Sequence, residues 1–560
     1  MNGSSSSVKR IVILGGGFGG VYTAMYLENL LRRRDDVEIV LVNKENYFVF
    51  QPMLAEIVSG NIGLFDTVNP IRRLLPRTKL YIREVEHIDL EQQTVTLTPG
   101  FRPRPLTLHF DHLVMALGTV TDFRDIPGLH EHALPFKYLA DAVRLRNHLI
   151  HVMQEAAIET DPQLREELLT FVVAGGGFSG VEVAAQMNDF LRDIAREYGI
   201  KRQDIRVMLV HAGERILERE VPERLGLYAQ KHLVKRGLEL MLNRRLKTAT
   251  PDSAVLADGS RIPTKTLVST VPSSPNPLIE TLPLPTDRGK IKIDQFFEIE
   301  GFPNVSSLGD CCLMPNPTGE GFCPPTAQHA IRQAKVLAHN IVSKLYGGER
   351  QRFTFKGLGK MGSLGHRSAV ALLFDKFRVK GVLAWMMWRT VYWWKLPGFT
   401  RKMKVGLSWI LDLMFRPETV QLNLGSSKAI SQLHFEPGEA IFRQGDLGDS
   451  LYIILEGEAD VIVEQNGSER TVARLKAGEY FGEMALLKQK TRTATVRCAT
   501  PMSLLALGQG DFQALVANLP DLQKSFQGVM ETRTQANLSL QGGMETTEAT
   551  IPSPAASDTA

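Results

Sequence analysis

A glycine-rich turn that occurs twice is the feature that most constrains what this chain can fold into. The first copy, Gly15–Gly20, follows an apolar β-branched run and precedes a helical pattern, and the second copy, Gly175–Gly180, has the same flanks. In such a strand–turn–helix unit, glycines permit the tight turn and let backbone amides approach a pyrophosphate at the helix N-terminus. Because the pattern is repeated, it predicts two Rossmann-like domains in one α/β enzyme, each with its own nucleotide.

Composition narrows the class of protein further. The chain has 560 residues, of which 43% are hydrophobic and 22% charged, which is typical of a globular protein with three or four domains. The net charge of +4 is too small to indicate nucleic-acid binding. The four cysteines form no CxxC pair, so neither a metal site nor a dithiol centre is expected. We expect no secretory leader and no membrane-spanning helix, since no apolar N-terminal segment and no long uncharged apolar run occur.

The residue at the end of the second strand of each fold bears on the ribose of the nucleotide. An acid is expected there, about 20 residues past the glycines. Asn43 occupies this position in the first fold and His211 in the second. Either side chain can hydrogen-bond a ribose hydroxyl without a negative charge. In the second fold, the missing acid would not repel a 2′-phosphate, and Arg215 is a candidate partner for such a phosphate. The sequence therefore leaves NADH and NADPH open.

Five motifs in order along the chain, GGGFGG, ALGT, GGGFSGVE, LGDCC and PPTAQHA, resemble those of the type II NADH dehydrogenases. These are single-chain, non-pumping NADH:quinone oxidoreductases of the pyridine nucleotide-disulfide oxidoreductase-like superfamily. The resemblance covers about residues 8–415. It implies a respiratory-chain flavoprotein whose first fold binds FAD and whose second fold binds NADH or NADPH. By this resemblance a hydride passes from NAD(P)H to FAD, and two electrons then pass to a membrane quinone.

The same resemblance implies roles for particular residues. Asp310 matches the family aspartate on the FAD ribityl chain, and the expected catalytic residues are Glu182 and Gln328. Glu182 is expected to relay protons or to orient the nicotinamide, although the dipole of a helix start also favours a carboxylate there. The expected FAD contacts are Gly15, Gly17, Phe18, Gly19, Gly20, Asn43, Lys44, Val85, Ala116, Gly118, Asp310, Ala327 and Gln328. The expected NAD(P)H contacts are Gly175, Gly177, Phe178, Ser179, Gly180, Glu182, His211 and Arg215.

The chain departs from the family pattern at three places. Arg332, with Gln333 beside it, replaces the second glutamine that the family commonly has. The usual acids are missing at Asn43 and His211, and residues 270–272 replace an alanine–glycine turn. Two alternatives to a quinone reductase therefore stay open. One is an NAD(P)H-dependent flavoprotein reductase of a soluble acceptor, and the other is a redox and cyclic-nucleotide sensor.

An aromatic and basic segment follows the second nucleotide fold. All five tryptophans lie there, namely Trp385, Trp388, Trp393, Trp394 and Trp409. Residues 371–416 contain nine Lys or Arg and only two acids, and helices are predicted over Gly381–Trp394 and Lys402–Phe415. Helices of this composition, too short and charged to span a bilayer, are typical of a membrane interface. We expect peripheral attachment to the cytoplasmic face of the cell membrane through these tryptophans. A core helix pair or a dimer surface is the alternative, and a homodimer stays open.

The C-terminal part of the chain has a different character. Short strands separated by regularly spaced turns begin at Leu433 and include Leu451–Ile454 and Ala459–Val463, which predicts a small β-barrel or jelly roll. The segments Phe481–Leu487 and Arg492–Ala494 resemble the phosphate-binding cassette of cyclic nucleotide-binding domains.

That cassette contains the residue types that a cyclic nucleotide needs. Glu483 can accept a hydrogen bond from a ribose 2′-hydroxyl, and Arg492 can pair with the cyclic phosphate. The expected contacts are Gly482, Glu483, Met484, Ala485, Arg492 and Thr493. The hydroxyl of Thr493 leaves cGMP open beside cAMP, and a scaffold barrel that binds nothing is the remaining alternative.

These inferences define an expected domain order. The fold class is α/β, with two Rossmann-like FAD and NAD(P) domains, interfacial amphipathic helices, and an α+β domain with a β-barrel core. The expected segments are a disordered N-terminus (1–8), an FAD domain (9–135 and 290–345), an NAD(P)H domain (136–289), a membrane-associating helical region (346–416), a linker (417–432), a cyclic nucleotide-binding domain (433–540) with closing helices from Val516, and a disordered tail (541–560).

Overall fold

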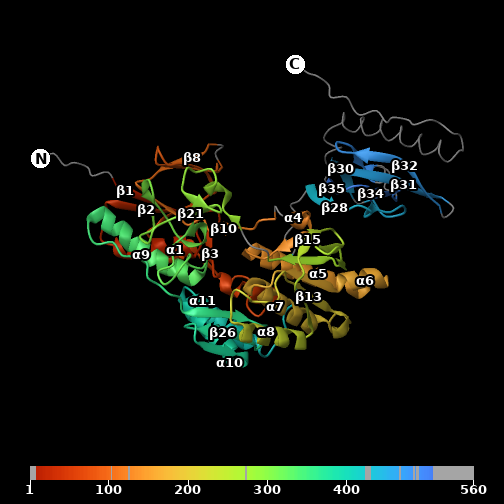
Figure 1. The fold of residues 1–560 in the computed structure, drawn as a ribbon, viewed down its shortest axis with the longest axis horizontal. Coiled ribbons are helices and arrows are strands. Elements are labelled where there is room, and N and C mark those ends of the chain that lie inside the picture. Colours follow the sequence, from red (N-terminus) through yellow and green to blue (C-terminus); the bar gives the residue numbers. More distant parts are fainter. Residues whose placement is uncertain are drawn as a thin grey trace, which may run out of the picture. The chain divides into compact units, whose positions relative to one another are not determined.

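The computed structural model describes residues 8–101, 104–123, 126–270, 274–422, 430–448, 450–465, 468–483, 486 and 491–508 (Figure 1). The chain divides into two compact units. The first unit comprises residues up to Asp122, Leu134–Arg244 and Val268–Gln421. The second comprises Phe123–Ala133, Arg245–Leu267 and the residues from Leu422 onward. The N-terminal tail, Met484, Ala485, the helices expected from Val516 and the expected tail 541–560 lie outside the described residues.

The first glycine turn leaves the central strand of a six-stranded sheet. In this sheet β1 (Lys9–Leu14) pairs in parallel with β2 (Val37–Asn43) and β9 (His112–Met115). The outer strands are β5 (Lys79–Ile82), β23 (Phe302–Ser307) and β22 (Glu298–Ile299). The β1 residues from Ile11 to Leu14 are completely buried, as expected of a parallel sheet covered on both faces. Helices α1 (Phe18–Leu30) and α9 (Ala327–Tyr346) pack against each other (Figure 1).

The second glycine turn repeats this arrangement. The parallel strands β12 (Thr170–Ala174), β13 (Arg206–Val210) and β14 (Leu238–Met241) belong to a five-stranded sheet. Its other strands are β18 (Thr266–Ser269) and β11 (Ala133–Pro135). The helices around it are α7 (Phe178–Ile194), α8 (Glu223–Lys235), α5 (Leu139–Ile158) and α6 (Pro162–Leu168). Helices α5 and α6 are separate, because Asp161 caps the start of α6 and Pro162 occupies its first turn.

Smaller elements connect these folds within the first unit. The helical ones are η1 (Gln51–Met53), α2 (Leu54–Ser59), α3 (Ile71–Leu74), η2 (Arg202–Asp204), η3 (Pro277–Ile279) and η4 (Gly309–Cys311). The strands are β3 (Tyr47–Val49), β4 (Val68–Pro70), β6 (Val85–Asp89), β7 (Thr94–Leu97), β8 (Leu106–His109), β10 (Thr119–Val120), β19 (Ser274–Pro275), β20 (Thr286–Asp287), β21 (Lys290–Lys292), β24 (Cys312–Leu313), β25 (Gly359–Ser363), β26 (Ala369–Leu373) and β27 (Phe377–Lys380).

The two helices expected at a membrane interface are α10 (Gly381–Lys395) and α11 (Phe399–Asp412). Trp394 is 70% exposed, and Trp385 and Trp393 are half-buried. Trp388 and Trp409 are 2% and 8% exposed and belong to the hydrophobic core. The expectation that all five tryptophans contact a bilayer surface is therefore wrong for Trp388 and Trp409. Among the described residues, no helix combines the length and the apolarity that crossing a bilayer requires.

The second unit contains the barrel and a small sheet from the middle of the chain. The barrel has two four-stranded sheets. They consist of β28 (Ile430–Phe435), β35 (Met502–Gly508), β30 (Ser450–Glu456) and β33 (Tyr480–Phe481), and of β29 (Ala440–Phe442), β34 (Thr495–Cys498), β31 (Glu458–Gln465) and β32 (Ser468–Lys476). The other elements are α4 (Leu129–His132), β15 (Leu246–Ala249), β16 (Ser253–Leu256) and β17 (Arg261–Pro263). The strands predicted over 451–454 and 459–463 are confirmed, and β28 begins inside the segment expected to be a linker.

Candidate active site

A cavity of about 900 Å³ opens in the first unit at the carboxyl end of the first parallel sheet. The turn after β1 lines it, together with residues that follow β2 and β9 and with the start of α9. Ser179 and Glu182 of α7 line the same cavity, so residues of both nucleotide folds meet there. The expected FAD contacts that line it are Gly15, Gly17, Phe18, Gly19, Asn43, Lys44, Val85, Ala116, Gly118, Asp310 and Ala327.

The backbone of the first turn requires glycine at two positions. Gly15 has a φ of +107°, a conformation that side chains disfavour. A Cβ on Gly20 would lie 1.8 Å from the carbonyl oxygen of Gly15, so Gly20 packs against the turn, and it does not line the cavity. Asn43 Oδ1 accepts a hydrogen bond from the backbone N–H of Gly16 at 2.8 Å. The asparagine in the ribose position therefore braces the turn itself.

The second turn has the same construction. Gly175 has a φ of +120°, and a Cβ on Gly180 would lie 1.9 Å from the carbonyl oxygen of Gly175. His211 Nδ1 accepts a hydrogen bond from the N–H of Gly176 at 3.1 Å, as Asn43 does in the first fold. Of the expected NAD(P)H contacts, only Ser179 and Glu182 line the large cavity. Those that lie away from it are Gly175, Gly177, Phe178, Gly180, His211 and Arg215.

The guanidinium of Arg215 is hydrogen-bonded to backbone groups of the protein itself. Its guanidinium N–H groups donate to the backbone carbonyl oxygens of residues 216, 217, 218 and 221, at 3.3–3.4 Å. It also lies directly against Gly226 of α8, where an added Cβ would be 1.9 Å from Arg215 Nη1. A carboxylate is closer to the turn, since Glu220 Oε1 lies 3.0 Å from where a Cβ on Gly177 would be. The cation expected near a 2′-phosphate is thus used to hold the loop after β13.

Glu182 is the expected catalytic residue whose environment is most unusual. Its Oε1 accepts a hydrogen bond from the backbone N–H of Ser363 at 2.8 Å. Burial raises the pKa of its carboxyl group to about 8, with the charge of Glu56 adding to the effect and the Ser363 hydrogen bond opposing it. A carboxyl group with such a pKa keeps its proton at neutral pH and can release it to a base. It can therefore act as a general acid in the cavity.

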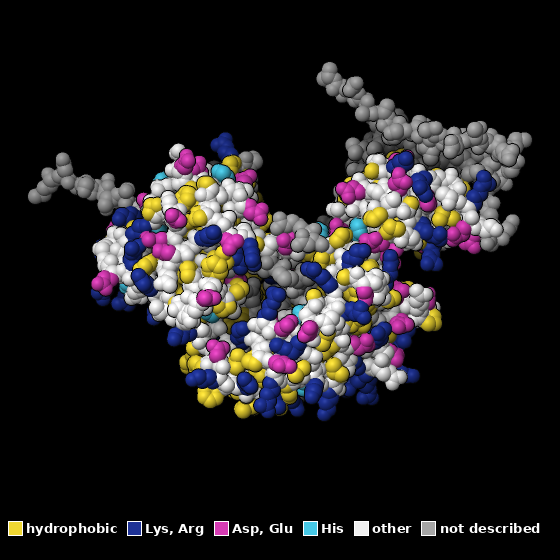
Figure 2. Space-filling model, in the orientation of Figure 1, with side chains coloured by type: hydrophobic (Ala, Val, Ile, Leu, Met, Phe, Trp, Pro, Cys, Tyr) yellow, Lys and Arg dark blue, Asp and Glu magenta, His cyan; other side chains and the backbone are white. Residues whose placement is uncertain are grey.

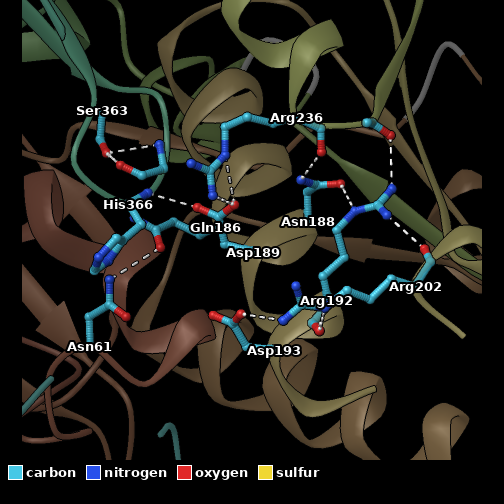
Figure 3. A network of polar contacts seen from close by, with 12 residues as sticks. Asn61, Gln186, Asn188, Asp189, Arg192, Asp193, Arg202, Arg236, Ser363 and His366 are labelled. Atoms are coloured by element: carbon cyan, nitrogen blue, oxygen red, sulfur yellow. Dashed lines mark hydrogen bonds and ion pairs between the residues drawn. The ribbon is translucent and has the colours of Figure 1, made fainter. Parts of the chain in front are cut away.

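A polar network anchors the helix that carries Glu182 (Figure 3). Asp189 of α7 is 7% exposed and accepts hydrogen bonds from the N–H of His366 at 2.7 Å and from Arg236 at 2.5 Å. Arg192, one turn further along α7, donates to backbone carbonyls of residues 202, 205 and 237. Because these bonds tie α7 to several neighbouring segments, they restrict the position of the Glu182 carboxyl group.

The cavity also contains a basic residue that sequence reasoning missed. Lys137 lines it and donates a hydrogen bond to Thr119 Oγ1 at 2.7 Å. Burial lowers the pKa of the Lys137 amine to about 8, and the charge of Asp310 opposes that effect. No glycine pattern or strand end marks Lys137 in the sequence. It reaches the cavity because the chain returns there between the two nucleotide folds.

Helix α9 contains the expected FAD contacts Ala327 and Gln328, but only Ala327 is at the cavity. Ala327 lines the cavity, whereas Gln328 does not, because its side-chain amide bonds the backbone N–H of Leu358 and the carbonyl oxygen of Gly359. Arg332, at the position of the family's second glutamine, stacks on Phe355 with its guanidinium carbon 4.0 Å from the ring centroid. Gln333, beside it, accepts the N–H of Gly309 at 2.9 Å and so braces the turn before Asp310.

In the second unit, the expected cyclic nucleotide contacts are partly described. Arg492 is 3% exposed and donates to the carbonyl oxygens of Gly482 and Ser450, each at 2.8 Å. Its guanidinium carbon lies 4.1 Å from the Phe442 ring centroid. Glu483 is 1% exposed and Thr493 is exposed, while Met484 and Ala485 lie outside the described residues. The two ionisable cassette residues are therefore both inside the barrel.

Family models match both the part of the chain that contains the two nucleotide folds and the part that contains the barrel. The family model described as pyridine nucleotide-disulphide oxidoreductase matches residues 9–334, and the cyclic nucleotide-binding domain model matches residues 432–518. The demethylphylloquinone reductase NdbB of Synechocystis is 32% identical over 408 residues, which cover 72% of this chain and 95% of the relative. The type II NADH:quinone oxidoreductase NdhA of Mycobacterium tuberculosis is 29% identical, covering 73% and 87%.

A solved structure shares the fold. NDH2 from Plasmodium falciparum, determined in complex with NADH, matches with a TM-score of 0.67 at 18% identity, covering 74% of this chain and all of that one. The expected α/β fold class with a C-terminal β-rich domain is thus confirmed. The chain belongs to the pyridine nucleotide-disulphide oxidoreductase family, as a type II NADH:quinone oxidoreductase that carries a cyclic nucleotide-binding domain.

Proposed function

We propose that this protein is a membrane-attached, FAD-dependent dehydrogenase that oxidises NADH in preference to NADPH and reduces a membrane quinone. The observation that carries the proposal is the single cavity shared by the first glycine turn and by Glu182 of α7. FAD bound there would supply the hydride and electron chemistry, since amino-acid side chains cannot accept a hydride reversibly.

The residues of the cavity fit a flavin dinucleotide. Neither α1 nor α7 has an acidic residue in its first turn, so the helix dipole favours a pyrophosphate at each N-terminus. The carboxylate near the second turn, Glu220, belongs to the loop after β13. A Cβ on Gly17 would meet no protein atom within 4 Å, which leaves its backbone open to the cavity. Asp310 can accept hydrogen bonds from sugar-chain hydroxyls, and Lys137 supplies an N–H donor in the same cavity. Both glycine turns can therefore accept pyrophosphate groups.

Preference for NADH follows from the charges near the second turn. Arg215 donates to four backbone carbonyls, so recruiting it for a 2′-phosphate would leave those oxygens to find other donors. Glu220 lies beside the turn and would repel such a phosphate. The 2′-hydroxyl of NADH carries no charge and meets neither obstacle.

Glu182 acts in this scheme as the proton source for the quinone. Reducing a quinone to a quinol takes two electrons and two protons, whereas one NADH delivers two electrons and one proton as a hydride. The second proton must come from the protein or from water. Glu182 lines the cavity and has a pKa raised to about 8, so at neutral pH it holds a proton that it can donate.

The decisive experiment measures NADH and NADPH oxidation by the detergent-purified protein with and without a short-chain quinone. We expect quinone-dependent turnover of at least about 1 per second, in the range of ordinary enzymes, and a higher kcat/KM for NADH. Flavin that NADH reduces but quinone does not reoxidise would overturn the proposal and favour a soluble acceptor or a sensor. Ferricyanide, which needs no proton, serves as the control acceptor.

Membrane attachment is supported by the outer faces of α10 and α11. The exposed apolar side chains on these helices and just after α11 include Val382, Leu383, Met386, Trp394, Phe399, Met403, Leu407, Ile410, Leu411, Met414 and Phe415. Figure 2 shows hydrophobic and basic side chains interspersed over the part of the first unit where Figure 1 labels α10 and β26. Apolar residues mixed with lysine and arginine suit the interface of an anionic membrane, and the cytoplasmic leaflet is the expected one.

Sedimentation with lipid vesicles tests this attachment. We expect the protein to bind vesicles of phosphatidylcholine and phosphatidylglycerol more strongly than pure phosphatidylcholine. The double variant Met403→Glu/Leu407→Glu, on the exposed face of α11, is expected to lose most binding while it retains NADH–ferricyanide activity. Leu227→Glu/Val234→Glu, on exposed positions of α8, is the matched control. Equal loss with both double variants would argue against docking through α11.

Cyclic nucleotide binding is supported by the buried pair Glu483 and Arg492. A cyclic phosphate can compete for the guanidinium N–H groups that now donate to Gly482 and Ser450, because a charged acceptor is stronger than a carbonyl. Isothermal titration with cAMP and cGMP tests binding, with Arg492→Lys expected to weaken it at least about tenfold, equivalent to about 1.4 kcal/mol. Absence of binding by the unaltered protein would leave the barrel as a scaffold.

A further inference from the structure

Behind the cavity, the first unit buries a second carboxyl group with an arginine and two tryptophans. Glu56 of α2 is 2% exposed and Arg389 of α10 is 7% exposed. Glu56 Oε2 accepts the indole N–H of Trp409 at 2.7 Å, and Glu56 Oε1 lies 3.7 Å from Arg389 Nη2. The Arg389 guanidinium lies between the rings of Trp385 and Trp409, at 4.2 and 4.8 Å from their centroids. Glu56 is thus held from two sides by groups of α10 and α11.

This cluster has more negative than positive charge. The same Arg389 Nη2 lies 3.2 Å from Asp412 Oδ2, so one guanidinium serves two carboxylates. His366 faces the Asp412 side of the cluster, where burial lowers the pKa of its ring and keeps it neutral near pH 7. A cation shared between the buried Glu56 and the partly buried Asp412 cannot fully compensate both carboxylates, which favours a proton on the more deeply buried Glu56.

The cluster adjoins the catalytic helix. Helix α2 packs against α7, and the two residues before Glu56, Leu54 and Ala55, line the same cavity as Glu182. Tyr392 of α10 also faces Glu182, and its phenol has a raised pKa, chiefly through burial. The groups that act on Glu182 are therefore the Ser363 N–H, Trp388, Tyr392 and Glu56, and Glu56 is the one among them that ionises near neutral pH.

We propose that Glu56 is a positioning residue for Glu182: a second proton-holding carboxyl group, fixed by Arg389 and Trp409 behind the cavity, whose charge controls when Glu182 gives up its proton. This inference rests on the proposed role of Glu182 in quinone reduction. Each quinol formed takes one proton beyond the hydride of NADH, so Glu182 must lose and regain one proton in every turnover. An ionised Glu56 opposes ionisation of Glu182 and therefore speeds its reprotonation.

The direction in which Glu56 shifts the pH dependence of turnover follows from the pKa values of Glu56 and Glu182. Burial raises the pKa of Glu56 to about 7, Arg389 opposes that effect, and Asp412 adds to it. Above neutral pH, Glu56 is therefore charged and helps to keep the proton on Glu182, whose pKa is about 8. Turnover that requires a protonated Glu182 falls as pH rises through the pKa of Glu182. Removing the charge of Glu56 lowers that pKa and moves the decline to lower pH.

The test compares pH–rate profiles for quinone-dependent NADH oxidation. Glu56→Gln keeps an oxygen that can accept the Trp409 indole N–H but carries no charge, and we expect the alkaline decline to move down by roughly one pH unit, equivalent to about 1.4 kcal/mol. Glu182→Gln is expected to lose this decline and most quinone turnover. Glu28→Gln is the matched control, because Glu28 is a buried carboxylate of α1 that binds Arg77 and Thr78 instead. An unchanged decline in Glu56→Gln would overturn the proposal.

A second readout does not depend on turnover. Infrared difference spectra of the purified protein across neutral and alkaline pH report protonated carboxyl groups directly. We expect two buried carboxyl bands that titrate near and above neutrality, one missing in Glu56→Gln and the other missing in Glu182→Gln. Asp412→Asn is expected to make the Glu56 band titrate at lower pH, because the variant removes the second carboxylate that pairs with Arg389. Bands that titrate independently of each other would also overturn the proposal.

These outcomes separate the inference from the proposed function. If the unaltered protein does not turn over quinone, the proposed function fails, whereas coupled carboxyl bands would still demonstrate that Glu56 controls Glu182. If quinone turnover is normal but the bands are uncoupled, the inference fails alone. NADH oxidation with ferricyanide as acceptor shows whether each variant still binds and oxidises NADH. Should Glu56→Gln not fold, Asp412→Asn decides the question, since Asp412 is only partly buried and lies at the end of α11. A Glu56 that ionises at lower pH is then expected to move the Glu182 band to higher pH, and an unmoved Glu182 band would overturn the proposal.

Discussion

The two glycine turns of this protein have nearly the same backbone but different surroundings. In each turn the first glycine has a positive φ. The last glycine lies so close to the carbonyl oxygen of the first that a Cβ on the last glycine would collide with that oxygen. In each, the side chain at the end of the second strand accepts the N–H of the middle glycine, from Asn43 in one fold and His211 in the other. The turn itself therefore specifies a pyrophosphate site and nothing about which nucleotide occupies it.

The difference lies in what other elements bring to each turn. The first turn borders a cavity that also receives Lys137, Asp310 and Glu182 from distant parts of the chain. The second turn lies close to Glu220, while the guanidinium of Arg215 binds carbonyl oxygens of the loop after β13. Residues outside the glycine turn therefore decide which nucleotide binds, although the turn itself identifies the fold. Four sets of variants test this difference between the two turns.

The largest effects are expected from alanine at the last glycine of each turn. Gly20→Ala and Gly180→Ala place a Cβ 1.8 and 1.9 Å from a carbonyl oxygen, so each turn must distort. We expect Gly20→Ala to lose bound flavin by roughly tenfold or more, and Gly180→Ala to keep flavin while its KM for NADH rises by a similar factor. Flavin absorbance per chain and steady-state kinetics measure the two effects.

Gly17→Ala serves as the control for misfolding. Its Cβ would meet no protein atom within 4 Å, so the fold should remain intact while the backbone's approach to a pyrophosphate is blocked. We expect an unchanged melting temperature without flavin and reduced flavin content. If Gly20→Ala and Gly180→Ala lost the same nucleotide, the assignment of one nucleotide to each turn would have to be abandoned.

A smaller effect is expected from acids at the two ribose positions. His211→Asp adds a negative charge where a 2′-phosphate would lie, and we expect kcat/KM for NADPH relative to NADH to fall about tenfold, or about 1.4 kcal/mol. Asn43→Asp makes the matched change in the first fold and should leave this ratio unaltered. Ratios that change equally in both variants would mean that the effect is not local to the second turn.

Arg215→Ala is expected to affect stability more than specificity. The loss of hydrogen bonds to four backbone carbonyls should lower the free energy of unfolding by about 1–3 kcal/mol. The NADPH-to-NADH ratio should stay within about twofold, a difference of about 0.4 kcal/mol. Thermal unfolding and kinetics on the same preparation measure both quantities. A selective loss of NADPH activity would instead show that Arg215 leaves its carbonyls to bind a phosphate.

The smallest effect is expected at Thr270, which abuts the second turn where Ala116 abuts the first. Thr270 Oγ1 donates to the carbonyl oxygen of Ala174 at 2.8 Å. Thr270→Ala makes the two surroundings more alike and should cost about 0.5–1.5 kcal/mol of unfolding free energy. The KM for NADH should change by less than about twofold. A larger change in KM would indicate that the Thr270 hydroxyl contacts the nucleotide.

Much of this architecture could be predicted because it is encoded locally. The strands and helices around both turns, the barrel strands β30 and β31, and eleven of the expected FAD positions at the cavity follow from short patterns or from motifs. The predictions for Trp388 and Trp409 failed because amphipathic periodicity identifies an apolar face but not what covers it. In the structure those two rings pack into the core of the first unit, and Trp394 stays exposed.

The two dinucleotide turns can be recognised from the amino-acid sequence, since only glycine allows their positive φ values and their close backbone approach. The barrel can be recognised from it as well, because alternating strands and regularly spaced turns leave few other folds. Tertiary structure alone decided that Lys137 enters the cavity, that Arg215 is occupied, and that Glu56 meets Arg389. Glu56 and Arg389 come from distant parts of the sequence, whereas Arg215 binds carbonyl oxygens that are near in sequence but converge only in the folded loop. The charge of a buried group such as Glu56 acquires a function only when folding removes it from water.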